Sequence, residues 1–199
     1  MFGKSVILTI FSKYIEKQNK SVFIIDTCLE YTSISVIFGK TINESVQKIS
    51  KNIYCMYYKI DENNFFYLEN IIEEKKKEFE FILIDTILDT NSNFYKYIIN
   101  KSDNIFFLIE PNLIELQKAK EILEKYKYDR EILNQKIKII FNKVNEYQIS
   151  KDILEDLFYE YKILGYIKYN SEYNIYVNKN TNYLIEEKAF EKIYKKISK

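Results

Sequence analysis

The sequence predicts a three-layer α/β fold in which helices cover both faces of a mostly parallel β-sheet. Short apolar segments alternate with longer amphipathic segments along the 199 residues, which is the pattern of repeated strand–helix–strand units. Several short segments are continuous runs of Ile, Val and Phe, as expected of strands that are buried on both faces. Two of them end in aspartate, at Asp26 and Asp85, and ligands of open α/β sheets bind beyond the carboxyl ends of the strands.

The apolar runs predict six strands, and the amphipathic segments predict six helices. The strands cover residues 21–26, 53–58, 79–85, 104–109, 136–142 and 162–167. The helices cover residues 4–17, 65–77, 92–102, 112–126, 150–161 and 182–197. In the fourth helix one apolar stripe predicts the buried face: Leu113, Leu116, Ile122, Leu123 and Tyr126. No linker, repeat or low-complexity tract interrupts the pattern, so residues 1–199 are interpreted as a single domain.

Composition excludes several classes of function. The chain has 30 basic and 29 acidic residues, whereas general nucleic-acid binders carry a net basic surface, so nucleic-acid binding is not expected. The absence of His removes His-based catalysis and most zinc sites. Cys28 and Cys55 lack metal-ligand spacing and are interpreted as reduced thiols of a cytoplasmic protein. The apolar run at residues 6–11 is too short to span a membrane and has no cleavage site.

A buried strand that ends in aspartate has two interpretations. The carboxylate can hold Mg²⁺, directly or through water, or it can cap the helix or turn that follows. Two such strands, ending at Asp26 and Asp85, favour a metal–phosphate site over two independent caps.

The start of the chain supplies a second part of such a site. Gly3, Lys4 and Ser5 open the first predicted helix and match the tail of a phosphate-binding loop, in which a lysine reaches the phosphates and a hydroxyl binds Mg²⁺. The amino end of the helix adds unpaired N–H groups and a favourable dipole. A Gly-Lys-Ser triplet is common by chance. The interpretation therefore depends on the position of this triplet, one helix ahead of a strand that ends in Asp.

Five segments, taken in order, carry a resemblance to one known family. Residues 3–26 read GKSVILTIFSKYIEKQNKSVFIID, residues 79–86 read FEFILIDT, and residues 102–123 read SDNIFFLIEPNLIELQKAKEIL. Residues 137–145 read IKIIFNKVN, and residues 163–180 read ILGYIKYNSEYNIYVNKN. With matching gaps, these segments resemble GK(S/T)T followed by VLLID, then YDYIIIDT, ADEIILVTEPDLLSLRNAKRLL, VLNRVN and LLGVIPYDPEVREAINKG of the MinD/ParA family of P-loop ATPases. The resemblance implies the fold of that family.

The resemblance also implies a binding site for ATP and Mg²⁺. Gly3, Lys4 and Ser5 would contact the phosphates, and Ser5, Asp26 and Asp85 would surround the metal ion and its waters. Among these residues, Asp26 would take the catalytic role.

Two further residues are implied for the nucleotide base. Asn142 would hydrogen-bond the adenine edge, and the backbone near Tyr169 would line the base pocket. The alternative for Asn142 is a turn residue at the end of a strand.

Three departures from the family pattern bear on activity. Met1 and Phe2 stand where the last loop residues before Gly3 belong, so the signature lysine of the loop is not in the sequence, and neither is the strand before the loop. The family's DxD motif reads DTC, so Cys28 replaces a carboxylate tied to activating the attacking water. We therefore expect ATP turnover at or near background. The sequence is interpreted as either truncated or as a degenerate family member that lacks the first strand and half of the P-loop.

The predicted function is an ATP-binding positional switch that forms a homodimer and recruits a partner complex. Residues 25–39 resemble the TadZ/CpaE branch of pilus-assembly proteins, and the near-neutral charge favours a pilus or secretion system over DNA partitioning. The alternative is a non-hydrolysing pseudo-ATPase scaffold or a fragment of a larger TadZ-like protein. Peripheral membrane association through the amphipathic C-terminal segment is less favoured than packing of that segment, as the last helix, on the sheet.

Overall fold

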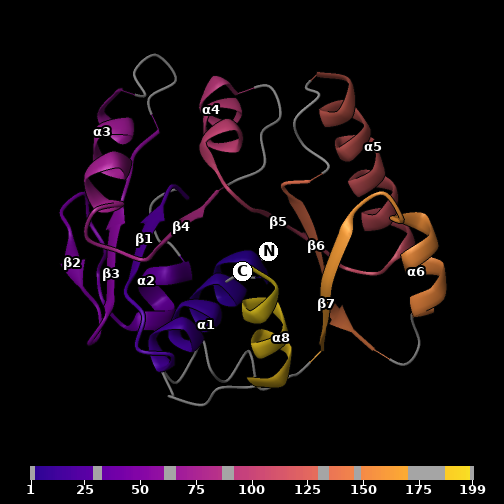
Figure 1. Ribbon diagram of the computed structural model, residues 1–199, viewed down its shortest axis with the longest axis horizontal. Coiled ribbons are helices and arrows are strands. Elements are labelled where there is room, and N and C mark those ends of the chain that lie inside the picture. The colour runs from indigo at the N-terminus through magenta and orange to yellow at the C-terminus, as the bar shows by residue number, and fades with distance from the viewer. Residues whose placement is uncertain are drawn as a thin grey trace. The chain divides into compact units, whose positions relative to one another are not determined.

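The fold is described from a computed structural model that covers residues 3–28, 33–60, 66–86, 92–129, 135–145, 149–169 and 187–197. The chain divides into two compact units. Unit 1 contains the described residues of Met1–Asn100, and unit 2 contains those of Lys101–Asn170 and Glu186–Lys199. Each unit has its own sheet of mostly parallel strands with helices on both faces (Figure 1), which confirms the predicted fold class.

The sheet of unit 1 has four strands in the order β2-β3-β1-β4. The short edge strand β2 (Gln47–Lys48) is antiparallel to β3 (Ile53–Tyr57), whereas β1 (Val22–Asp26) is parallel to both β3 and β4 (Phe81–Asp85). All five residues of the central strand β1 are buried, as its continuous apolar run predicts.

Helices lie on both faces of this sheet, with α3 (Phe66–Lys75) and α4 (Asn93–Lys101) on one side and α1 (Gly3–Lys17) and α2 (Ser33–Phe38) on the other (Figure 1). The sheet packs against α3 and α4 through a core cluster of Phe23, Ile25, Met56, Tyr58, Leu68, Ile72, Phe94 and Ile98. Burying each large side chain stabilises the fold by about 1.5–3 kcal/mol, so this cluster is a main support of the sheet.

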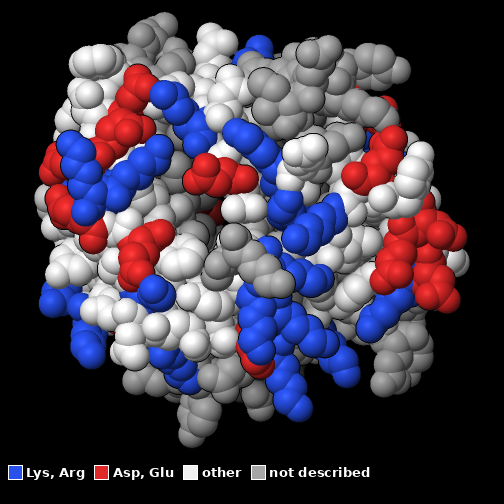
Figure 2. Space-filling view, in the orientation of Figure 1, with Lys and Arg blue, Asp and Glu red and all other residues white. Residues whose placement is uncertain are grey.

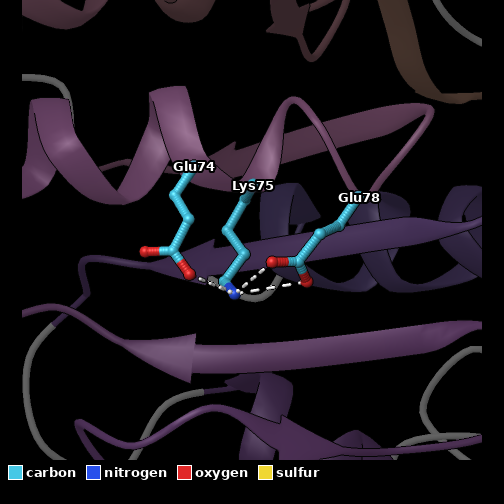
Figure 3. Close-up of polar contacts among 3 residues, drawn as sticks. All are labelled: Glu74, Lys75 and Glu78. Carbon is cyan, nitrogen blue, oxygen red and sulfur yellow. Dashed lines mark hydrogen bonds and ion pairs between the residues drawn. The ribbon is translucent and has the colours of Figure 1, made fainter.

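Two helix ends in unit 1 have identifiable stop signals. Beyond α1, Asn19 adopts a left-handed backbone with φ 58°, and the N–H of Lys20 donates to the carbonyl of Ile15 at 3.4 Å. At the end of α3, the Lys75 ammonium contacts the Glu74 carboxylate at 3.2 Å and the Glu78 carboxylate at 3.1 Å (Figure 3). A lysine in the last turn also complements the helix dipole.

The sheet of unit 2 is parallel and has the strand order β5-β6-β7. Its strands are β5 (Ile105–Ile109), β6 (Ile137–Val144) and β7 (Lys162–Lys168). The central strand β6 buries Ile137, Ile139, Ile140 and Phe141. Its pairing with β7 is irregular at two places, between Ile139 and Ile140 and between Phe141 and Val144. The second irregularity includes Asn142, one of the predicted site residues.

Helix α8 (Glu187–Ile197) packs on β7 through its apolar face. Phe190 and Ile193 are buried, and Ile193 approaches to 3.8 Å of the position that a Cβ atom on Gly165 would occupy. The Lys196 ammonium donates to the carbonyls of Ile163 and Leu164 at 3.0 and 2.8 Å. The segment is therefore the last helix of unit 2, as expected, and no helix among the described residues is long and apolar enough to cross a membrane.

The strand predictions agree closely with the structure, and the helix predictions differ from it in several places. Among the described side chains of α5 (Leu113–Asp129), the buried ones are Leu116, Ala119 and Leu123. Leu113 is 78% exposed, so its assignment to the buried stripe was wrong, and the side chain of Tyr126 lies outside the described residues. Asn112 explains the difference, because its side-chain oxygen accepts the Glu115 N–H at 3.0 Å and places Leu113 in an exposed first turn.

Other differences concern the lengths and number of elements. Helix α6 (Lys151–Leu157) is shorter than predicted, and neither α2 nor β2 was expected from the sequence. Residues 182–186 of the last predicted helix lie outside the described residues, as does residue 65 of the second predicted helix.

Candidate functional site

Asp26 and Asp85 lie directly opposite each other at the carboxyl ends of neighbouring strands. They are register partners in the parallel pairing of β1 with β4. Their side chains are almost fully buried, with relative exposures of 0% and 3%. Parallel strands that both end in Asp bring the two carboxylates to the same edge of the sheet, as the sequence pattern predicted.

The two residues after Asp26 hold this edge in place. The backbone N–H and the hydroxyl of Thr27 both donate to the carbonyl oxygen of Asp85, at 3.1 and 2.7 Å. The N–H of Cys28 donates to Oδ1 of Asp26 at 3.0 Å, which is the turn-forming role that the sequence analysis gave as an alternative. Thr27 was missed by the sequence analysis, although its hydroxyl directly after a strand-ending Asp was a usable signal.

The first turn of α1 lies beside the same edge. The Lys4 side chain is exposed, and its ammonium donates to the carbonyl oxygen of Thr86, one residue past β4, at 3.1 Å. Ser5 is half-buried, and its hydroxyl acts on the carboxyl group of Asp85. Gly3 is the first residue of the helix. Five of the predicted site residues, Gly3, Lys4, Ser5, Asp26 and Asp85, are therefore all found in unit 1, four of them with direct contacts at this edge.

Burial dominates the electrostatics of the edge. Burial raises the pKa of Asp85 above its ordinary value, and the Ser5 hydroxyl, the Lys4 charge and the Cys28 thiol oppose this effect only in part. Burial, followed by the charges of Asp85 and Asp26, raises the pKa of the Cys28 thiol to about 12. A group with this pKa is neutral at physiological pH and cannot replace a carboxylate as a base.

The arrangement is suited to hold a cation. One carboxylate oxygen from each of Asp26 and Asp85 and the sulfur of Cys28 lie within 4.8 Å of one another. Oδ2 of Asp85 is buried and accepts no hydrogen bond from the described residues, which is costly unless a ligand satisfies it. Asp26 and Asp85, with the Ser5 hydroxyl near them, offer the hard oxygen donors that Mg²⁺ prefers, so these residues fit the ion that the family resemblance implies.

Asn142 occupies a distorted part of β6 in unit 2. Its side chain is 4% exposed, and Oδ1 accepts no hydrogen bond from the described residues. The next residue, Lys143, has a left-handed backbone with φ 58° and forms an ion pair with Glu110. The register shift between Phe141 and Val144 accounts for this conformation, because bulges redirect side chains and leave the ladder locally unpaired.

Tyr169, the second residue assigned to the base, follows β7. Its side chain is 55% exposed, and its backbone N–H donates to the carbonyl of Val144 at 2.9 Å. The backbone at Tyr169 is thereby tied to the end of β6, two residues beyond Asn142.

Charged side chains are distributed unevenly over unit 2. Figure 2 shows basic side chains over α8, in the lower centre of the view, and acidic side chains over α6, at the right. The exposed lysines of α8 are Lys188, Lys192, Lys195 and Lys196, and the exposed acidic residues of α6 are Asp152, Glu155 and Asp156. The charge is therefore separated locally although the chain as a whole carries a formal net charge of only +1.

Parallel α/β sheets with this succession of strands and helices define a P-loop NTPase fold of the MinD/ParA type. The sequence profile of the CobQ/CobB/MinD/ParA nucleotide binding domain matches residues 2–183, and the chain belongs to this family. No sequence among the curated proteins matches the chain.

Solved structures of three relatives share the fold at low sequence identity. MinD in the MinC:MinD cell division complex of Aquifex aeolicus is 14% identical, with a TM-score of 0.81 over 100% of this chain and 92% of that chain. A ParA family ATPase from Chlorobium tepidum is 16% identical, with a TM-score of 0.75 over 98% and 88% of the two chains. The septum site-determining protein MinD of Pyrococcus horikoshii, solved with Mg-ADP, is 15% identical, with a TM-score of 0.75 over 100% and 91%.

Proposed function

We propose that this protein binds ATP with Mg²⁺ at the edge formed by β1, β4 and the first turn of α1, and that the bound nucleotide controls recruitment of a partner complex. The observation that carries the proposal is the convergence of Lys4, Asp26 and Asp85 within unit 1. A cation, buried carboxylates and a helix amino end are the groups that a metal–phosphate ligand needs.

Each residue has a defined part in this proposal. Gly3 allows close approach of the phosphates to the backbone, the Lys4 ammonium binds their oxygens, and the Ser5 hydroxyl is a ligand of Mg²⁺. Asp26 and Asp85 bind Mg²⁺ directly or through its waters, and when bound the ion would offset negative charge on the phosphates. Asp26, whose Oδ1 is fixed by the Cys28 N–H, is the candidate catalytic residue.

Asn142 and Tyr169 are assigned to the nucleotide base. The buried side-chain oxygen of Asn142 has no hydrogen-bond donor among the described residues, so an exocyclic amine of adenine would satisfy it. The backbone at Tyr169, anchored to Val144, would line the base pocket.

Hydrolysis is proposed to be slow, so that binding rather than turnover is the working step. The neutral Cys28 thiol occupies the position of a carboxylate in the family pattern, and it neither accepts a proton from water nor orients water as strongly as a carboxylate does. This supports the pseudo-ATPase reading, in which the fold retains the nucleotide and a partner surface without appreciable turnover.

The partner is proposed to be a component of a pilus or secretion system, with the protein acting in the cytoplasm as a homodimer of the TadZ/CpaE type. One relative, MinD of Aquifex aeolicus, is seen in complex with the protein MinC, which supports a protein partner in general terms. A partition system is less favoured, because the basic surface of α8 is local and α6 is acidic.

The test is direct measurement of Mg-ADP and Mg-ATP binding by calorimetry. Lys4→Ala should weaken binding at least about tenfold, since hydrogen bonds to charged groups contribute about 1.5–3 kcal/mol. Lys17→Ala is the matched control, because Lys17 is an exposed lysine at the opposite end of the same helix. Equal affinities of the Lys4→Ala variant and the wild type would reject the proposed site.

A phosphate-release assay separates the switch from the scaffold. Nucleotide binding with release at background supports the non-hydrolysing form. Mg²⁺-dependent release that Lys4→Ala abolishes would show an active ATPase and contradict the role given to Cys28.

A further inference from the structure

The sulfur of Cys28 lies beside the carboxylates of Asp26 and Asp85 at the edge of unit 1. Cys28 Sγ and one carboxylate oxygen each from Asp26 and Asp85 lie within 4.8 Å of one another. Asp26 and Asp85 are almost fully buried, and Cys28 is half-buried. The sequence shows no metal-ligand spacing around Cys28, because Asp85 is 57 positions later and is brought close by the pairing of β1 with β4.

A second observation points to a ligand in this place. Oδ2 of Asp85 is buried and accepts no hydrogen bond from the described residues, and the carboxyl group is only 3% exposed. The Lys4 ammonium, the basic group of the edge, donates its hydrogen bond to the Thr86 carbonyl. The Ser5 hydroxyl and the Cys28 thiol act on the same carboxyl group, but Oδ2 has no donor among the described residues, and a bound cation would satisfy it.

The donor set selects the kind of cation. Mg²⁺ takes oxygen ligands in an octahedral arrangement and retains several waters, so the sulfur of Cys28 contributes nothing to its binding. Thiolate ligands favour Zn²⁺, which accepts carboxylate oxygen and sulfur together in a tetrahedral site. Ligand atoms of such a site are about 3.5 Å apart, given metal–ligand distances of about 2.0–2.3 Å, so atoms that already lie within 4.8 Å of one another need only small side-chain movements to bind one ion.

Neighbouring hydrogen bonds orient the Asp26 carboxylate and fix the backbone at Asp85. The Cys28 N–H donates to Oδ1 of Asp26 at 3.0 Å, and Thr27 binds the backbone carbonyl of Asp85 through both its N–H and its hydroxyl. Contacts of this kind fix ligand orientation and raise the affinity of metal sites.

We infer that Asp26, Cys28 and Asp85 form a binding site for a thiophilic divalent metal ion of the Zn²⁺ class, with a fourth position open to water or a phosphate oxygen. The thiol proton is released to solvent when the sulfur binds the ion. This site lies at the same edge as the proposed nucleotide site and adds Cys28 to the carboxylates assigned there to Mg²⁺; it applies to the metal ion alone, without nucleotide.

Cobalt is the probe, because Co²⁺ occupies zinc sites and gives a sulfur-to-metal charge-transfer band in the near ultraviolet. The chain contains no His and only two Cys, so in protein without an affinity tag such a band arises only from Cys28 or Cys55. The wild type should bind Co²⁺ in a 1:1 ratio with this band, and equimolar Zn²⁺ should remove it. Mg²⁺ at the same concentration should leave it unchanged.

Variants assign the band to one sulfur. Cys28→Ser should abolish the band and weaken Zn²⁺ binding at least about tenfold, which is the lower end of the effect expected on removing a ligand or its support. Cys55→Ser is the matched control and should retain the band, because Cys55 lies inside β3 and is not part of the group. Cys28→Asp should lose the band and bind Mg²⁺ or Mn²⁺ more tightly than the wild type does. Far-ultraviolet circular dichroism verifies that each variant is folded.

The results separate this inference from the nucleotide proposal. A folded wild type with no charge-transfer band, or a band that persists in Cys28→Ser, overturns the metal site, whether or not Mg-ADP binds. Cobalt binding with the expected variant pattern, together with no binding of Mg-ADP, supports the metal site and rejects the nucleotide proposal.

Discussion

The buried carboxylate of Asp85 should lower the stability of the protein at neutral pH. Its side chain is 3% exposed, and Oδ2 accepts no hydrogen bond from the described residues. Each unit by which burial raises the pKa of this carboxyl group corresponds to about 1.4 kcal/mol of lost stability once the group is ionised. Asp85→Asn, which removes the charge and keeps the size, is therefore expected to raise the free energy of unfolding by about 1–3 kcal/mol at pH 7. For a chain of this length the melting temperature should rise by about 3–10 °C.

The pH dependence identifies the cause. Because burial raises the folded-state pKa of Asp85, the unfolded chain loses this proton first as the pH rises. Below the ordinary Asp pKa, Asp85 is protonated in both the folded and the unfolded state and costs no stability. As the pH rises from that value through the raised folded-state pKa, the free energy of unfolding decreases. The advantage of Asp85→Asn should be present at pH 7 and should disappear near pH 4.

The assay is urea unfolding of metal-free protein, followed by circular dichroism at pH 4 and pH 7. Asp103→Asn is the control, since Asp103 is exposed and a surface substitution should change stability by less than about 0.5 kcal/mol. An advantage of Asp85→Asn that is as large at pH 4 as at pH 7 would show that charge burial is not its source. A loss of stability at pH 7 would refute the reasoning altogether.

Four further outcomes are expected. Thr27→Val should lower the free energy of urea unfolding by about 1 kcal/mol, because the buried hydroxyl bond to Asp85 is lost while the shape is kept; no change would contradict this assignment. Asn19→Ala should lower thermal stability by about 1 kcal/mol and Asn19→Gly should not, because φ is 58° there; equal effects would exclude the backbone as the cause. Phe23→Ala should cost about 3–5 kcal/mol in the same unfolding assay, and a cost below 1 kcal/mol would show that this cluster is not the core. In a Cys55→Ser background, Cys28 should react with iodoacetamide at pH 8 at least about tenfold more slowly than free cysteine, since its pKa is about 12; a rate like that of free cysteine would contradict the burial of its charge.

Strands were easier to predict than helices because their signals lie in contiguous residues. The runs at β1, β4 and β5 are short, apolar and bounded by polar residues, so both type and position follow from the sequence. Helix α2 gave no such signal, since Ser33–Phe38 is short and rich in β-branched residues that disfavour helices. Burial of Ile34 and Ile37, which only the folded unit provides, stabilises it.

The candidate site was partly predictable for the same reason. Asp26 and Asp85 could be brought together from sequence, because parallel strands place their carboxyl ends at one edge. The contacts of Lys4 with Thr86 and of Thr27 with Asp85 join residues more than fifty positions apart, and no periodicity reports such pairs. The proximity of Cys28 to both carboxylates depends likewise on the pairing of β1 with β4.

The hydrogen bond of Lys4 has a consequence for which ligands can enter. The ammonium is exposed, but it is engaged with a neutral acceptor of the chain, the carbonyl of Thr86. A ligand binds this lysine only if its acceptor atoms form a stronger hydrogen bond than the Thr86 carbonyl does. Hydrogen bonds to anionic oxygens are roughly twice as strong as those between neutral groups. Weakly accepting anions such as chloride gain little from the exchange, whereas a polyphosphate gains at several oxygens at once. When Lys4 turns to such a ligand, the Thr86 carbonyl loses its hydrogen bond. Binding of a highly charged ligand therefore changes the contacts of the backbone directly after β4.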